Sequence, residues 1–414
     1  MYRISYRGDN NLDKIGRLKP KYVNNHPFGG YKLSRAEIAE IKRVSPNTKV
    51  ILYRSGVELF NPTGITQYGP IEWATTGEQA FAESQTSTAD WQDIWQNHKN
   101  WLAKDKNGKY IHRQDGWAFA QPGVAYLANI GNPGYQQWLA DWVKEKITVD
   151  GFDGVYFDLM YPGYFNGGWR CFDYKPCFPV YNGISTSQQL ESQWRTWEIR
   201  LVTHIRSKLK KDPATENGII FLNAILGITD FKDQNGIQYL KDTNPDGITF
   251  DGWRIMETDQ WEDGVKLLNN ISKNGLYSVP LANIHDKVWS QDEAQRVYQF
   301  YLSSFLLAYH NNSALRIRLK IKQNAGDTKG KPKYYLTEIA DFFTTNNLGQ
   351  PQAEYAKSSN GVYSRAFTNS LVVVNPSNQN KTFIVDQKYI NAFFHDLSYV
   401  AGASITLPPQ SGTV

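Results

Sequence analysis

Two nearly identical hexapeptides in this chain each end in a carboxylate. The sequence reads DGVYFD at residues 153–158 and DGITFD at residues 246–251. Because side chains alternate across a strand, Asp158 shares a face with Tyr156, and Asp251 takes the same position in the second copy. A pair of carboxylates flanking a glycosidic bond can hydrolyse it, one as the acid and the other as the nucleophile or base.

Strand-like runs and helix-like segments alternate along the chain around these hexapeptides. The runs are short, and several of them, such as KVILYRSG and GIIFLNAIL, are rich in apolar and β-branched residues. Amphipathic segments such as LSRAEIAEIKRV (33–44) lie between them. The expected strands, in chain order, are KYVNNHP (21–27), KVILYRSG (49–56), AYLANIG (125–131), GFDGVYFD (151–158), GIIFLNAIL (218–226), DGITFDGW (246–253), SVPLANIH (278–285) and ALRIRLKI (314–321). This alternation predicts an α/β fold, a (β/α)8 TIM barrel. A doubly wound open sheet is the alternative, but no Gly-x-Gly-x-x-Gly turn supports it.

The pattern changes after residue 350. Short strand-like runs such as SLVVVNPS and ASITLPPQ follow one another, separated by Asn, Pro, Gly and Ser, without helical segments between them. We therefore expect residues 1–350 to form a catalytic barrel and residues 351–414 to form a C-terminal antiparallel β-domain that resembles a β-sandwich.

In a barrel of this kind, the active site lies at the carboxyl ends of the strands. The two hexapeptides are the fourth and sixth expected strands, which contribute side chains to the same interior layers. Asp158 and Asp251 should then face each other across one cleft, about 5 to 10 Å apart. The alternative is that each Asp caps a helix or anchors a loop. Asp153 and Asp246, at the opposite ends of the same strands, are expected to be structural.

Further side chains at strand ends and in the adjoining loops are candidates for binding a substrate. Amide, imidazole and guanidinium groups could bind sugar hydroxyls, and aromatic rings could stack on sugar rings. These candidates are Arg54, Trp117, Tyr161, Trp169, Asn223, Trp253, Asn283 and His285. Loop hydrogen bonds and core packing are the competing roles for the same residues.

Several of these segments resemble a known family. GFDGVYFDLM, the carboxylate after the sixth strand and the closing GVYSRAF, LVVVNPS and ITLPPQSGTV are similar to hypothetical glycosyl hydrolase family fifteen, which is related to the α-galactosidase superfamily. The resemblance covers most of residues 20–414. By position it implies that Asp158 is the nucleophile and Asp251 the acid/base, with Glu257, six residues further on, as the alternative acid.

Composition argues against several other classes of protein. The 45 basic and 40 acidic residues are scattered, so the net charge of +5 forms no basic stripe of the kind that binds nucleic acid. No apolar run is long enough to span a membrane. The seven His residues are dispersed, without metal-binding motifs, and Walker, Rossmann and Gly-x-Ser-x-Gly motifs are missing. We therefore expect no metal and no cofactor.

Cys171 and Cys177 are the two cysteines of the chain. Their spacing in a Gly- and Pro-rich segment would allow a disulfide that closes a loop, and a disulfide favours an oxidising, extracellular setting. A free, buried or metal-binding pair is the alternative, but no second Cys or His pair lies nearby in the sequence to complete a zinc site. The first residues lack the pattern of a signal peptide, so either the protein is cytoplasmic or a presequence has been removed.

These observations together predict a glycoside hydrolase that acts on an oligosaccharide or polysaccharide with α-linked sugars and retains the anomeric configuration. A barrel that binds glycans without catalysis, and a transglycosylase on the same scaffold, are the alternatives. The residues do not specify the sugar or its linkage, endo or exo action, or the oligomeric state. A separation of Asp158 and Asp251 beyond about 6.5 Å would indicate an inverting mechanism in place of a retaining one.

Overall fold

The structure is a computed structural model. It describes residues 2–4, 12–27, 31–67, 72–113, 123–163, 169–170, 178–225, 234–256, 260–310, 313–321, 333–336, 348–390, 392 and 398–414. The chain divides into two compact units. Unit 1 comprises residues 1–224 and 235–246, and unit 2 comprises residues 225–234 and 247–414.

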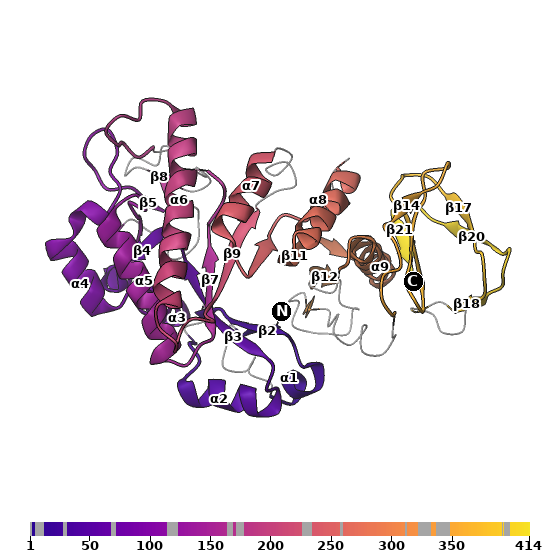
Figure 1. Ribbon diagram of the computed structural model, residues 1–414, viewed down its shortest axis with the longest axis horizontal. Helices are drawn as coiled ribbons and strands as arrows, with labels where there is room; N and C mark the ends of the chain where they lie inside the picture. The colour runs from indigo at the N-terminus through magenta and orange to yellow at the C-terminus, as the bar shows by residue number, and fades with distance from the viewer. Residues whose placement is uncertain are drawn as a thin grey trace. The chain divides into compact units, whose positions relative to one another are not determined.

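The core of unit 1 is a parallel sheet. Its strands are β1 (Tyr2–Ile4), β2 (Tyr22–Asn25), β3 (Lys49–Ser55), β7 (Gly154–Asp158) and β9 (Ile219–Ile225), in that spatial order. Figure 1 labels β2, β3, β7 and β9. β3 and β9 are buried along almost their whole length. Continuous burial is typical of parallel strands that are covered on both faces.

The prediction that residues 125–131 form the third strand of the parallel sheet is wrong. Ala125–Leu127 forms β6, which belongs to a separate antiparallel sheet with β4 (Glu58–Phe60), β5 (His112–Arg113) and β8 (Trp169–Arg170). It has no place in the parallel sheet because β3 pairs directly with β7, Tyr53 opposite Tyr156. The sequence did not predict β1 as a strand. Because β1, β2 and β3 precede β7 in the parallel sheet, β7 is still its fourth strand in chain order.

Several helices of unit 1, α2, α4, α5 and α6, begin at polar side chains that cap them. In α2 the Ser34 side chain accepts from the backbone N–H of Glu37, and the Glu37 side chain accepts from the backbone N–H of Ser34, which together form a capping box. α6 begins with the same arrangement at Thr186 and Gln189. The α-helices are α1 (Leu12–Leu18), α2 (Arg35–Val44), α3 (Glu72–Gln85), α4 (Thr88–Asn97), α5 (Pro133–Thr148), α6 (Ser187–Lys210) and α7 (Gln234–Thr243), and the 3-10 helices are η3 (Pro62–Gln67) and η4 (Lys99–Trp101).

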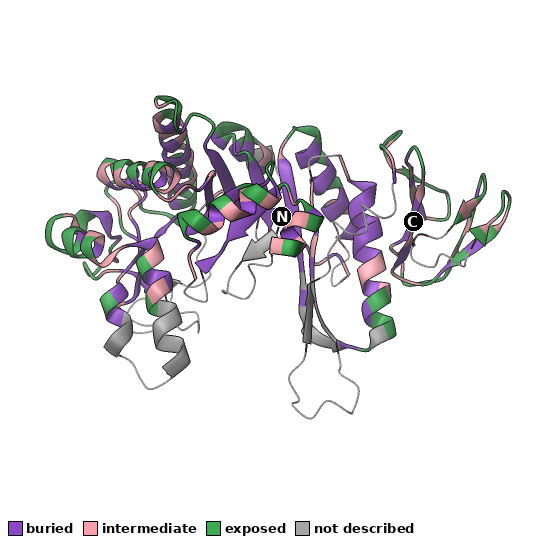
Figure 2. Ribbon diagram, turned by 90° about the horizontal axis from the view of Figure 1, so that it is seen from below, coloured by how far each residue is buried: buried purple, intermediate pink, exposed green. Residues whose placement is uncertain are grey.

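Unit 2 continues the alternation of parallel strands and helices. β10 (Gly247–Phe250), β11 (Tyr277–Trp289) and β12 (Arg316–Ile321) are parallel neighbours, and β13 (Lys333–Leu336) adds an antiparallel strand. β12 confirms the last strand expected from the sequence. α8 (Trp261–Lys273) and α9 (Gln291–Leu307) each combine a buried face with exposed polar residues (Figure 2).

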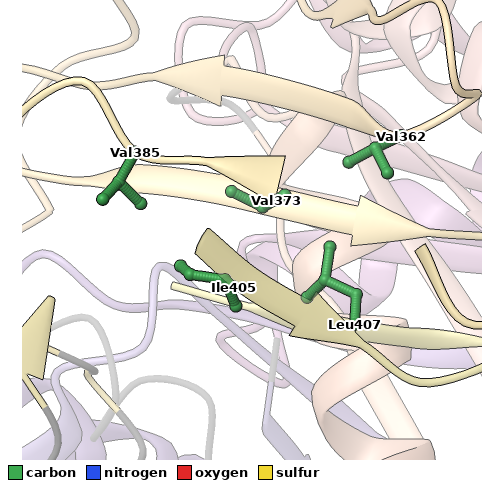
Figure 3. Close-up of a cluster of buried hydrophobic side chains, with 5 residues drawn as sticks. All are labelled: Val362, Val373, Val385, Ile405 and Leu407. Carbon is green, nitrogen blue, oxygen red and sulfur yellow. The ribbon is translucent and has the colours of Figure 1, made fainter. Parts of the chain in front are cut away.

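Antiparallel sheets form the C-terminal part of unit 2. One contains β14 (Ala356–Lys357), β15 (Tyr363–Ala366), β16 (Leu371–Asn375) and β21 (Ser411–Thr413). β17 (Lys381–Ile384) pairs with β20 (Ser404–Leu407), and β18 (Tyr389–Ile390) with β19 (Ser398–Tyr399). A small core of Val362, Val373, Val385, Ile405 and Leu407 lies between them (Figure 3). The predicted fold class, α/β and TIM-like with C-terminal antiparallel sheets, is confirmed. The domain boundary near residue 350 stays a prediction.

The sheet of β14, β15, β16 and β21 packs on α9 (Figure 1). Gly412 lies so close to this helix that a Cβ atom there would be 2.5 Å from the Cβ of Ser303. Arg365, which is 3% exposed, donates from Nη1 to the carbonyl oxygens of Leu307 at 2.7 Å and Tyr309 at 2.8 Å. These carbonyls lie at the end of α9, where no intrahelical donor is available. Arg365 therefore ties the sheet to the helix.

We expect Arg365→Met to lower the free energy of unfolding of unit 2 by roughly 2–4 kcal/mol, because buried carbonyls would lose their donors. Urea unfolding measures the change. Arg43→Met is the control, since Arg43 pairs with Glu40 on the exposed face of α2 and its loss should cost less than about 1 kcal/mol. Equal losses for the two variants would contradict this role of Arg365.

Candidate functional site

The strand that carries the first hexapeptide lies between β3 and β9. Ser55 is opposite Asp158 in the register of β3 and β7, and Phe157 is opposite Leu222 in the register of β7 and β9. Gly154 approaches β9 closely, since a Cβ atom there would be 2.0 Å from the carbonyl oxygen of Ile219. A glycine is therefore required at the start of β7.

Three donors hold the carboxylate of Asp158. Oδ1 accepts from the backbone N–H of Leu159 at 2.8 Å and from Nδ2 of Asn223 at 2.7 Å, and Oδ2 accepts from the hydroxyl of Tyr53 at 2.6 Å. The donors come from β3, from β9 and from the turn after β7. With a donor on each oxygen, the plane of the carboxylate is fixed, so the group is preoriented for reaction with a ligand.

Sequence reasoning missed Tyr53. Its ring lies 3.7 Å from the imidazole of His26 and 5.7 Å from the ring of Tyr156, measured between centroids, and its exposed fraction is 4%. The packing leaves the phenol little freedom to turn away from Asp158. Strand parity was the available signal, because Tyr53 is opposite Tyr156, which shares the face of Asp158.

Arg54 points to the other face of β3. Its guanidinium carbon lies 5.0 Å from the ring centre of Trp138 and 4.5 Å from that of Trp142, both on α5, and the side chain is fully buried. Burial lowers the pKa of Arg54 to about 10, and the neighbouring Tyr135 offsets part of that effect. The structure therefore places Arg54 in the layer between sheet and helices, away from Asp158.

The turn after Asp158 is strained and tightly held. Leu159 has a φ of 62°, a left-handed conformation that residues with a side chain rarely adopt. The N–H of Met160 donates to the carbonyl of Asn223 at 3.2 Å, and the N–H of Gly56 donates to the carbonyl of Asp158 at 2.9 Å. Tyr161 is only 8% exposed, so most of its ring packs inside unit 1.

Unit 2 contains two further predicted site residues with described side chains. Asp251 follows β10 directly and is partly exposed. Trp253 is fully buried: its Nε1 donates to the carbonyl of Gly264 at 3.4 Å, and its ring meets Tyr301 edge to face at 5.6 Å. Trp253 would have to leave this core to stack on a sugar.

The remaining predicted residues cannot be placed as side chains. Trp169 lies in β8, and Asn283 and His285 lie in β11, but only their backbones are described. Outside the described residues lie Trp117, Glu257, Cys171 and Cys177. The predicted disulfide and the alternative acid therefore stay predictions.

The first Asp of each hexapeptide has a structural role, as expected. Oδ2 of Asp153 accepts from the backbone N–H of Val50 at 2.8 Å, and Oδ2 of Asp246 accepts from that of Ile220 at 2.7 Å. Each carboxylate thus anchors the start of a neighbouring strand. Asp153 also lines a cavity of about 400 Å³, so this cavity lies at the opposite end of β7 from Asp158.

A buried acid that sequence reasoning missed lies behind the site. Glu198 on α6 is fully buried, and its Oε1 accepts from Nε1 of Trp194 at 3.1 Å. Burial raises the pKa of Glu198 well above its usual range, and the neighbouring Trp194, Tyr239 and Arg195 offset only part of that effect. Burial therefore favours the neutral acid.

The described residues contain neither a cluster of metal ligands nor a helix suited to span a membrane. Among them, no three His, Cys, Asp or Glu side chains gather as a metal site would require. No helix in the same part of the chain has the length and apolar character of a membrane span.

Comparison with known proteins identifies one family. The model of hypothetical glycosyl hydrolase family 15 matches residues 42–371 of the 414 in the chain. No curated protein matches.

One solved structure shares the fold at low identity. A noncanonic maltogenic alpha-amylase, AmyB, from Thermotoga neapolitana has a TM-score of 0.51 and 10% identity, covering 100% of this chain and 95% of that chain. A GH36 alpha-galactosidase, AgaA, from Geobacillus stearothermophilus has a TM-score of 0.49 and 9% identity, covering 98% of this chain and 52% of that chain, so the chain spans about half of that protein. At this identity the first structure supports the fold alone, and we conclude nothing from the second.

Glu198 generates a prediction about stability and pH. Because its folded pKa is raised, its stabilising contribution is complete below the unfolded pKa of about 4.3 and is lost as pH rises toward and through the folded pKa. Glutamine does not titrate, so the stability of Glu198→Gln relative to the unchanged protein should increase from pH 4 to pH 8. Urea unfolding at each pH measures this difference. Glu145→Gln, at an exposed position, is the control, and a difference for Glu198→Gln that stays flat or shrinks would contradict the prediction.

Proposed function

The chain belongs to hypothetical glycosyl hydrolase family 15, and we propose that it hydrolyses glycosidic bonds with Asp158 as its nucleophile. The observation that carries this proposal is the carboxylate of Asp158, oriented by three donors at the carboxyl end of a buried parallel strand. Active sites of barrels lie at this end of the strands.

The proposed chemistry has two steps. In the first, an oxygen of Asp158 attacks the anomeric carbon, the glycosidic C–O bond breaks, and a general acid protonates the departing oxygen. In the second step, the residue that acted as the general acid is now a base and takes a proton from water. The resulting hydroxide displaces Asp158 from the anomeric carbon. The anomeric configuration is retained because it is inverted twice.

We assign the acid/base role to Asp251, the final residue of the second hexapeptide. Its support is the repeated sequence and its position directly after β10. Glu257 is the alternative, and both residues are included in the experiment below.

We propose that the substrate is an oligosaccharide or polysaccharide with α-linked sugars. The family resemblance supports this class, and the fold shared with a maltogenic alpha-amylase makes α-linked glucans the first compounds to test. Asn223 lies beside Asp158, where its amide would orient the nucleophile and would be within reach of a sugar hydroxyl. The C-terminal domain from residue 351 is proposed to support the barrel, with no part in the chemistry.

The experiment is hydrolysis of a panel of α-linked glycans, followed by proton NMR of the first product anomer. We expect free sugars with retained configuration. Asp158→Asn and Asp251→Asn should each lower the rate by several orders of magnitude, because each removes a group that acts in the transition state. Asp93→Asn, on the exposed side of α4, should leave the rate unchanged.

Other outcomes would revise or reject the proposal. Loss of activity in Glu257→Gln, with Asp251→Asn still active, would move the acid to Glu257. New linkages in place of free sugars would indicate a transglycosylase. Binding of a glycan that is never cleaved would reject hydrolysis in favour of a glycan-binding barrel.

A further inference from the structure

A buried tyrosine from α7 reaches the turn that follows Asp158. The hydroxyl of Tyr239 donates to the carbonyl of Met160 at 3.1 Å, and the side chain is fully buried. Met160 is two residues beyond Asp158 in the sequence. No step of the proposed reaction uses Tyr239, and it lies too deep in unit 1 to touch a ligand in solvent.

The hydrogen bond from Tyr239 is one of several contacts that hold the strained turn after Asp158. Met160 donates its N–H to the carbonyl of Asn223 and accepts from Tyr239 at its own carbonyl. Asn223 is also the residue whose amide holds Oδ1 of Asp158 at 2.7 Å. Two residues later, Nε of Arg195 donates to the carbonyl of Pro162 at 3.0 Å. A turn that contains a left-handed leucine persists only when such contacts over-determine it.

Glu198 on α6 lies beside Tyr239 and is the next buried polar group in this set of contacts. The two groups are close enough that Glu198 raises the pKa of Tyr239, after the larger effect of burial. Oε2 of Glu198 is buried without a hydrogen-bond partner in the described part of the chain. A proton on Oε2 would complete the network: Glu198 would donate to the oxygen of Tyr239, whose own proton goes to Met160. Each buried polar group would then be satisfied.

We propose that Tyr239 and Glu198 are positioning residues, which hold the turn after Asp158 and thereby the reactive orientation of its carboxylate. They act through Met160 and Asn223 and contact no substrate. The inference rests on the proposed role of Asp158. It adds a support for that residue drawn from two helices, α6 and α7.

The kinetic test uses Tyr239→Phe, which removes one oxygen and keeps the ring. We expect kcat to fall roughly 10- to 100-fold, as small displacements of a reacting group do, with KM changed less than about twofold. Tyr181→Phe is the matched control. It removes the same oxygen from a phenol that packs against Trp197 of α6 and has no hydrogen-bond partner within the described ranges, so its kcat should not change.

Glu198 supplies a second pair of variants. Glu198→Gln keeps a neutral group that can donate to Tyr239 and accept from Trp194, so its kcat should stay within about threefold of the unchanged protein. Glu198→Leu removes both hydrogen bonds and should resemble Tyr239→Phe. If Tyr239→Phe fails to fold, this pair carries the test.

Hydrogen–deuterium exchange tests the same inference without any substrate. In Tyr239→Phe and Glu198→Leu, a peptide covering residues 158–163 should exchange faster, while Tyr181→Phe and Glu198→Gln should match the unchanged protein. If the unchanged protein cleaves no glycan, the proposed function fails, and exchange alone decides the inference. Tyr239→Phe that matches Tyr181→Phe in exchange, and in kcat where activity exists, would overturn it.

Discussion

The three hydrogen bonds to the carboxylate of Asp158 are the interaction on which this account of the chain depends. They come from three different segments: Tyr53 on β3, Asn223 on β9, and the backbone of Leu159 in the turn after β7. A freely rotating carboxylate would spend most of its time in unproductive orientations. Here the pairing of β7 with both neighbouring strands fixes the donors before any ligand arrives, so the cost of orientation is met in folding.

The rest of unit 1 bears the strain of that arrangement. The left-handed conformation of Leu159 costs on the order of 1–3 kcal/mol, and a buried acid such as Glu198 is costly to ionise. Both features lie around the turn after Asp158, where the N–H and the carbonyl of Met160 are both hydrogen-bonded. By contrast, Arg54 lies close to the rings of Trp138 and Trp142 on the opposite face of the same sheet, where it packs against α5.

Much of this arrangement could be predicted from local patterns. The period of two in DGVYFD placed Asp158 at a strand end on the face of Tyr156, and the β11–β12 pairing confirms a strand near ALRIRLKI. The same parity rule, applied to KVILYRSG, would have selected Tyr53 in place of Arg54. AYLANIG was misassigned because a short apolar run does not reveal whether its partners are parallel or antiparallel. The roles of Tyr239 and Glu198 could not be predicted from the sequence, since the contact of Tyr239 with Met160 depends on how α7 packs in unit 1.

Covalent trapping tests the central claim most directly, because it reports which carboxylate attacks the sugar. The protein would be incubated with a panel of 5-fluoro-α-glycosyl fluorides, and the labelled peptide would be mapped by mass spectrometry. The account predicts one added glycosyl group on Asp158, and none in Asp158→Asn. A label on Asp251 or on any other carboxylate would contradict it, as would turnover of an α-glycoside with inverted configuration.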